Sequence, residues 1–434
     1  MNVVLAKADT GRGVDRVFAA ARDRLPGADK VVDIRRKAFE AFERAGLPHR
    51  RLEEWKYTDL RALMREVLPL AGIPDAITLE RARPALALSR IEDATRLVLV
   101  DGVFAPTLSD AMENGVSVRT LREALEKGGV DLLSAGTPDA MISLNAALAT
   151  DGVVVDVADG VALARPIQIV HLTTAVSASV VTRSQFKVGN GARATLVESF
   201  AAADGAKGYQ ANDALIVSVG DNAELSQVRL MADSLDATNI TSAIYAIGAK
   251  TKLNLFNMTS GGAVSRFQGF LTFAGEGSEL SVNGVNLLKG TQHGDTTLVV
   301  DHAVPECLSR EMFRAVVDDR AHSVFQGRII VRPDAQKTDG KMMTRALLLS
   351  DDAEADNKPE LEIFADDVTC GHGATTGALD DDLLFYLRAR GLPEKEAQAL
   401  LIRAFVGEAI EGIADENLRE VAMNQAERWL EARV

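Results

Sequence analysis

The centre of the chain alternates hydrophobic and polar residues with the period of two that is typical of β-strands. Four segments there align with one another, beginning at Val188, Val219, Ile247 and Ala274. In each, the apolar residue is followed by glycine, two turn residues and a small residue, and then by the alternation. The anchoring glycines are 31, 28 and 27 residues apart. The pattern predicts strands joined by tight turns, in which we expect the glycine to have positive φ.

A repeat of this length favours one coil of a β-solenoid. A single coil has no core of its own, whereas stacked coils share a continuous one. A β-sandwich or a meander is the alternative, in which each repeat is one hairpin of a larger β-structure. The strand pattern continues through Ser323–Val331 and Arg345–Ser350 and ends near Phe364. The exposed end of a solenoid is a free β-edge, which has to be capped or used as an interface.

Both ends of the chain have helical periodicity instead. Val31–Ala45 has apolar residues at helical spacing and stops before Gly46, a residue typical of helix C-termini. Near the other end, Asp380 is a suitable N-cap for a helix that ends at Gly391. We therefore expect three units: an N-terminal helical region (1–95), a β-helix core (96–365), and a segment (366–434) with a Cys-x-His loop and a C-terminal helical domain.

Composition excludes several classes of protein. The 434 residues carry a formal net charge of −14, which argues against a protein that binds nucleic acid through clustered lysine and arginine. No apolar run approaches the roughly 20 residues that cross a bilayer, and the N-terminus lacks the apolar region of a signal peptide. We expect no membrane association and a cytoplasmic location. Two cysteines, Cys307 and Cys370, provide neither a disulfide framework nor a CxxC metal site.

The negative charge is concentrated at the C-terminal end. Residues 351–434 contain 20 acidic and 8 basic residues, a net charge of −12, against −2 for the preceding 350 residues. Such asymmetry indicates either a partner surface or the solvated face of helices.

The densest group of candidate metal ligands is Cys370 and His372, two positions apart between glycines. A thiolate and an imidazole at this spacing suit iron or zinc, but two ligands do not complete a site. The alternative is a glycine-rich turn with a buried thiol. His293 and His302 flank a predicted strand, where we expect structural histidines rather than ligands. The sequence contains no GxxxxGK[ST] phosphate loop.

A series of motifs in the C-terminal half resembles the SufB/SufD family, the scaffold subunits of the SUF iron–sulfur cluster assembly system. Glu53–Thr58 and Val100–Phe104 resemble the same family. Glu53–Thr58 favours its SufD branch over the SufB paralogue, as does the missing cysteine-rich N-terminal segment. The C-terminal motifs are Phe325–Ile329, Ala335–Asp339, Leu347–Ser350, Pro359–Ile363, Ala365–Ala374 and Phe385–Gly391.

The resemblance implies a mainly β fold, with a right-handed parallel β-helix flanked by N-terminal and C-terminal helical regions. It implies a non-enzymatic scaffold that pairs with a SufB homologue through the β-helix and recruits the SufC ATPase through its C-terminal helices. For the isolated chain two states stay open, a monomer and a homodimer paired through the free β-edge. His372, with Cys370 beside it, would contact iron or a nascent, transient iron–sulfur cluster at the SufB interface. The isolated chain would bind no cofactor tightly. Gly371 replaces the family's usual serine, which puts the loop geometry in doubt.

Two functions of other classes compete with this one. A β-helix enzyme acting on carbohydrate would need carboxylates or arginines clustered along one solenoid face, and no regular ladder of that kind is visible. A plain interaction protein would share the partners and lack the metal role.

Overall fold

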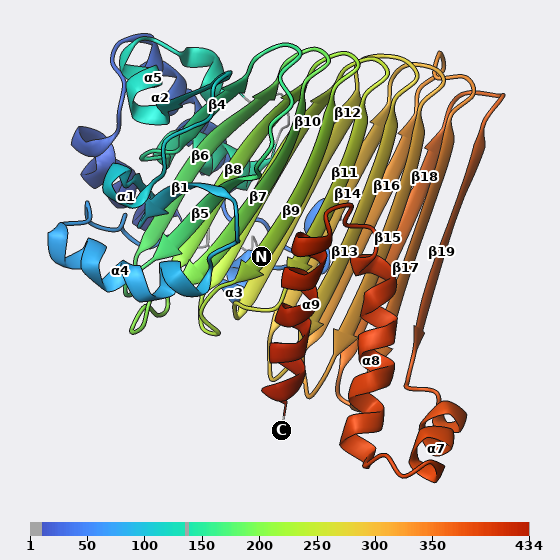
Figure 1. Cartoon of the computed structure of the whole chain (residues 1–434). Helices are drawn as coiled ribbons and strands as arrows, with labels where there is room; N and C mark the ends of the chain where they lie inside the picture. The colour runs from blue at the N-terminus through green and yellow to red at the C-terminus, as the bar shows by residue number, and fades with distance from the viewer. Residues whose placement is uncertain (1–10, 135–138, 434) are drawn as a thin grey trace, which may run out of the picture.

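Successive strands of the chain alternate between two sheets, so that each pair of strands forms one coil of a parallel β-solenoid (Figure 1). The computed structural model describes residues 11–134 and 139–433. The described part of sheet 1 contains β1 (Thr95–Val100), β2 (Val103–Phe104), β5 (Ile167–Thr173), β7 (Arg193–Ala202), β9 (Glu224–Ala232), β11 (Lys252–Thr259), β13 (Glu279–Leu288), β15 (Leu308–Val317), β17 (Asp339–Leu348) and β19 (Thr369–Gly377).

Sheet 2 faces sheet 1 across the core. Its described strands are β3 (Val116–Thr120), β4 (Val153–Val157), β6 (Ser179–Val188), β8 (Gln210–Val219), β10 (Thr238–Ile247), β12 (Val264–Phe273), β14 (His293–His302), β16 (His322–Val331) and β18 (Glu354–Ile363). From β5 to β19, neighbouring strands within a sheet are parallel and in register. The mainly β prediction is therefore confirmed as a solenoid, and the sandwich and meander alternatives are excluded.

The four anchoring glycines occupy the predicted turns, but the prediction that they have positive φ is wrong. Positive φ occurs two positions later, at Gly191, Asn222, Lys250 and Gly277. The anchoring glycines themselves lie where one turn stacks on the previous one. A Cβ at Gly275 would lie 2.1 Å from the backbone nitrogen of Ala249, and similar clashes occur at Gly189, Gly220 and Gly248. Glycine is required there for the close approach of stacked backbones.

Stacking in register places equivalent side chains in columns inside the solenoid, a space we call the lumen. One column of sheet 1 contains Ala194, Leu225, Leu253, Leu280, Ser309, Gly340 and Cys370. The column next to it ends with Val282, Glu311, Met342 and His372. Most of these positions are apolar and belong to one continuous buried core. The polar members are therefore exceptions, and each needs a chemical reason.

Helices cover the outer faces of the sheets. The N-terminal helices are α1 (Gly11–Ala21), α2 (Lys30–Ala45), α3 (Leu60–Leu63) and α4 (Ala76–Leu88), and α5 (Leu121–Glu126) and α6 (Ala140–Leu148) follow β3. Helix α4 covers sheet 1 at β5, and α6 covers sheet 2 at β6 and β8. No helix in the described ranges is long and apolar enough to span a bilayer.

Trp55 is buried under Arg266 of β12. The guanidinium lies 3.8 Å from the centre of the indole ring, and the indole nitrogen donates to Asp139 at 3.0 Å. This contact fixes the Glu53–Thr58 segment on sheet 2.

The C-terminal helices are α7 (Asp381–Ala389), α8 (Glu394–Ile410) and α9 (Glu416–Glu431). Helices α8 and α9 pack on sheet 1, where Ile402, Val406 and Trp429 join a buried cluster with strand residues such as Phe256. Helix α7 has no buried residue and projects away from the sheets (Figure 1). Asp380 caps α7 by accepting a hydrogen bond from the amide of Leu383, as predicted.

The two ends of the solenoid differ. At the N-terminal end, the short strands β2 and β3 pair antiparallel with β1 and β4 and so cover their edges. At the other end, β18 and β19 have no further strand beyond them in the described chain. The segment expected to be a Cys-x-His loop is strand β19, because its backbone continues the ladder of β17. The last coil therefore extends to Gly377, beyond the expected boundary at residue 365.

Glu311 shows how strongly the apolar lumen disfavours a charged side chain. Its side chain is 2% exposed, and burial raises the pKa of its carboxyl from 4.5 to about 8. Unfolded chains ionise near the lower value, so the wild type loses stability as pH rises from 4.5 to 8. Glu311→Gln removes this ionisation. We expect its melting temperature to exceed that of the wild type by a few degrees at pH 9, with the difference shrinking toward pH 5.

Glu279→Gln, at an exposed position on β13, is the matched control, and its difference from the wild type should not change with pH. Equal changes in the melting temperature of Glu311→Gln at pH 5 and pH 9, measured by scanning calorimetry, would contradict a raised pKa at this position.

Candidate metal site at the open end of the solenoid

Cys370 and His372 lie on β19, the last strand of sheet 1. Residues two apart on a strand point to the same side, and here the register pairs Cys370 with Gly340 and His372 with Met342, whose side chain is in the luminal core. Cys370 is half-buried against that core, whereas His372 is exposed because no further coil of the described chain covers it. The two candidate ligands therefore sit together at the mouth of the lumen.

Gly371 does not disturb this arrangement. It pairs with Lys341 in the continuous ladder, and a Cβ added there would meet no atom within 4 Å. Its φ is not positive, so the position requires no glycine for backbone reasons. The doubt about the geometry around Gly371 is resolved, because strand pairing and not a turn orients Cys370 and His372.

Glu311 lies deeper in the lumen next to this site, and sequence reasoning missed it. It stands in the column of His372, separated from it only by Met342. Its carboxyl group also acts on Cys370 in the neighbouring column. The available signal was the alternation of β15, which turns Glu311 inward between apolar neighbours, but recognising it requires the register of three strands.

The electrostatics of the site keep Cys370 protonated. Partial burial raises the pKa of the thiol, and the carboxylates of Asp339 and Glu311 raise it further, while the backbone amide of Gly340 opposes them. A thiol of this kind is not a free nucleophile. It becomes a ligand when a metal ion displaces its proton.

The site is chemically incomplete within this chain. Among residues 11–134 and 139–433, neither Cys370 nor His372 belongs to a group of three His, Cys, Asp or Glu side chains close enough to hold one ion. A sulfur donor and a nitrogen donor suit iron or zinc, both of which need further ligands. Further ligands would have to come from outside the described chain.

His293, His302 and Cys307 have structural contacts. His293 and His302 lie at opposite ends of β14 and do not meet. His293 forms a 2.9 Å hydrogen bond with Thr58, and His302 forms one of 3.0 Å with Ser309. Burial lowers the pKa of both imidazoles to about 4, so both are neutral. Cys307 is buried in the luminal core as a small apolar residue.

Two family models match the chain. The SufBD core domain of SUF system FeS cluster assembly matches residues 171–405, and the SufBD protein N-terminal region matches residues 17–169. The core match contains nearly all of the solenoid, including Cys370 and His372, together with α7 and most of α8.

Individual proteins give the same result. The chain is 33% identical to the iron–sulfur cluster assembly protein SufD of Escherichia coli, over 87% of this chain and 88% of that protein. It is 30% identical to an iron–sulfur cluster assembly SufBD family protein of Synechocystis, over 88% and 87%. SufD of Bacillus subtilis is 24% identical over 91% and 93%. With both family models and these full-length similarities, the chain belongs to the SufBD family of iron–sulfur cluster assembly proteins.

Proposed function

We propose that this chain is a non-enzymatic scaffold subunit on which an iron–sulfur cluster is assembled together with a second protein. The observation that supports it most is the open end of the solenoid, where Cys370 and His372 offer two metal ligands on a strand with a free edge. The cluster is cargo in this proposal. A site with too few ligands of its own can hold cargo only while a partner is present.

In this proposal His372 is the principal ligand. Its imidazole is exposed, and a neutral imidazole binds iron without first losing a proton. Cys370 is a second ligand once iron displaces its proton. The remaining ligands are thiolates of a SufB-type partner, so that the cluster forms between the two chains.

The partner would add its strands to β18 and β19. Thr369 donates its amide proton to Thr338 of the preceding coil, so odd-numbered residues of β19 turn their amides toward β17. The amides of even-numbered residues, including His372 and Ala374, then point to the free edge. Strand addition satisfies such groups and selects a partner of the same fold. Without that partner, we expect two copies of this chain to pair at the same edge.

Helix α7 is the proposed contact for a SufC-type ATPase. Phe385 is 74% exposed, and Leu383 and Tyr386 on the same helix are also exposed. Asp381 and Asp382 in its first turn add negative charge. We place the contact on α7 and not on the other C-terminal helices, because the apolar faces of α8 and α9 are already buried against sheet 1. ATP would be hydrolysed by the partner, and both cysteines are free thiols, so we propose a cytoplasmic location.

His372→Ala tests the ligand role. Reconstituted with SufB-type and SufC-type partners and purified anaerobically, the variant complex should contain about tenfold less cluster iron and sulfide, because a ligand is lost. His49→Ala, in the N-terminal region, is the control and should retain the wild-type content. Unchanged iron and absorbance in an intact His372→Ala complex would leave a plain interaction protein as the function.

Ala374→Pro tests edge pairing. Proline removes an amide proton that points to the free edge and leaves the bonds to β17 in place. We expect loss of co-purification with the SufB-type partner and loss of self-pairing in size-exclusion chromatography. Ala374→Thr keeps the amide and should behave as the wild type. Full binding by the proline variant would show that the interface lies elsewhere.

Phe385→Asp tests the helix contact. Placing a charge on the exposed apolar face of α7 should abolish retention of a SufC-type ATPase in a pull-down, without a change in melting temperature. Ile77→Asp makes the same change at an exposed position of α4 and should have no effect. Equal retention by both variants would exclude α7 as the contact.

A further inference from the structure

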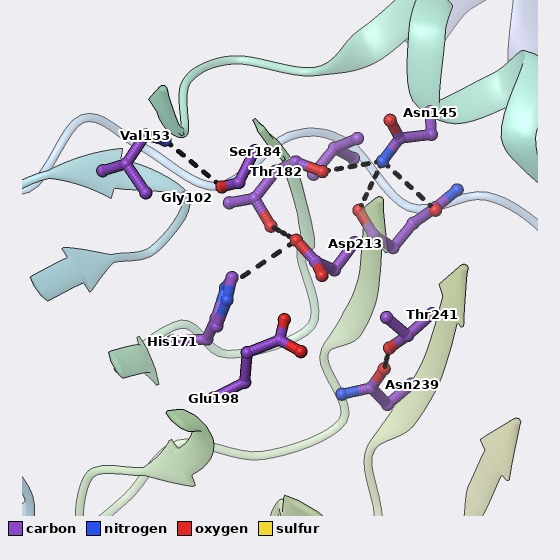
Figure 2. A network of polar contacts seen from close by, with 12 residues as sticks. Gly102, Asn145, Val153, His171, Thr182, Ser184, Glu198, Asp213, Asn239 and Thr241 are labelled. Carbon is purple, nitrogen blue, oxygen red and sulfur yellow. Dashed lines mark hydrogen bonds and ion pairs between the residues drawn. The ribbon is translucent and has the colours of Figure 1, made fainter. Parts of the chain in front are cut away.

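A second group of candidate ligands lies inside the lumen, near the N-terminal end of the solenoid. His171 of β5, Glu198 of β7 and Asp213 of β8 point toward one another (Figure 2). One potential ligand atom of each lies within 4.8 Å of those of the other two, and no other such group of three occurs in residues 11–134 and 139–433. His171 is 9% exposed, and the two carboxylates are almost completely buried.

Neighbouring side chains hold the three residues in place. Thr182 donates a 2.6 Å hydrogen bond to Oδ1 of Asp213, as Figure 2 shows. Gln227 donates one of 2.7 Å to Oε2 of Glu198. The imidazole of His171 stacks on the ring of Phe200, with the ring centres 4.3 Å apart. Such outer contacts orient ligands in metal sites.

Each of the three residues keeps one atom without a hydrogen-bond partner. These atoms are Nε2 of His171, Oε1 of Glu198 and Oδ2 of Asp213. Oxygens of ionised carboxylates only accept hydrogen bonds, so Glu198 and Asp213 cannot satisfy each other while both are charged. A buried cluster of this kind needs a cation or a donor at its centre.

The protein's own cations meet this need only in part. Arg229 forms an ion pair with Glu198 at 3.8 Å but donates no hydrogen bond to it, and its guanidinium lies against the rings of Phe200 and Phe267. Arg183 is directed out of the lumen, where it donates to Leu132 and Asn145.

We propose that His171, Glu198 and Asp213 bind one divalent first-row transition-metal ion as a resident ion. One imidazole and two carboxylates are donors that suit Fe²⁺, Mn²⁺, Co²⁺ or Zn²⁺. Bonds of about 2.1 Å place ligand atoms up to about 4.2 Å apart, so small side-chain shifts close the site. The ion would link β5 and β7 of sheet 1 to β8 of sheet 2. It is separate from the cargo site and departs from the expectation that the isolated chain holds no tightly bound cofactor.

The test uses the full chain alone, stripped of metal and dialysed against Co²⁺ without oxygen. We expect one bound equivalent and a higher melting temperature. Glu198→Gln and Asp213→Asn, which keep side-chain shape, should each weaken binding by at least about tenfold. X-ray absorption at the cobalt edge should show one imidazole among oxygen ligands and no sulfur.

Two controls separate this site from other possibilities. Asp233→Asn changes another buried carboxylate nearby, which is bonded to Tyr209 and Asn239, and should bind Co²⁺ normally. The double variant Cys370→Ala/His372→Ala should also bind normally, so failure of the proposed cargo site would not affect this result.

The proposal is overturned if the wild type takes up no Co²⁺, even when refolded in its presence. Sulfur ligation, or equal binding by folded Glu198→Gln and Asp213→Asn variants, would also overturn it.

Discussion

Parallel stacking in register is the constraint on which the whole molecule depends. Each strand between β5 and β17 pairs with the coil before it and the coil after it, which forces consecutive turns to lie directly on one another. Gly275 and its three equivalents satisfy that requirement, because any side chain there would collide with the previous turn. The same stacking leaves β18 and β19 with unpaired edges, so the place where another protein can join follows from the way in which the coils are built.

Stacking also decides where charge can be tolerated. A lumen filled with leucine, valine and phenylalanine offers few polar atoms to stabilise a carboxylate, and the raised pKa of Glu311 reflects this burial. The N-terminal third of the lumen nevertheless contains Glu198, Asp213 and Arg229 at buried positions. Their polar atoms are only partly paired. An apolar side chain in each column would pack without this cost, which is why the cluster points to a ligand rather than to stability.

Much of the fold was predictable, because the repeat lies in local sequence. Alternation and glycine spacing identified the solenoid, and Asp380 identified the start of α7. The role of the anchoring glycines was not predictable, since it depends on a contact with a turn about 30 residues earlier. Residue chemistry identified Cys370 and His372, but the strand they occupy was mistaken for a loop, because glycines dominate it. His171, Glu198 and Asp213 belong to three strands, and only their register brings them together.

The two groups of candidate ligands differ in their donor atoms and in their access to other proteins, and both differences follow from their positions in the solenoid. At the open end, a thiol and an imidazole lie together with no third ligand from the described chain, so in the proposed function a metal held there would depend on a second protein and would leave when that protein separates. Inside the lumen, an imidazole and two carboxylates come from one chain and from both sheets, so an ion held there leaves only if the coils open. Sulfur and nitrogen donors suit a cluster that is passed on, whereas oxygen and nitrogen donors suit an ion that stays. On this argument, iron delivered to the open end does not exchange with the luminal ion.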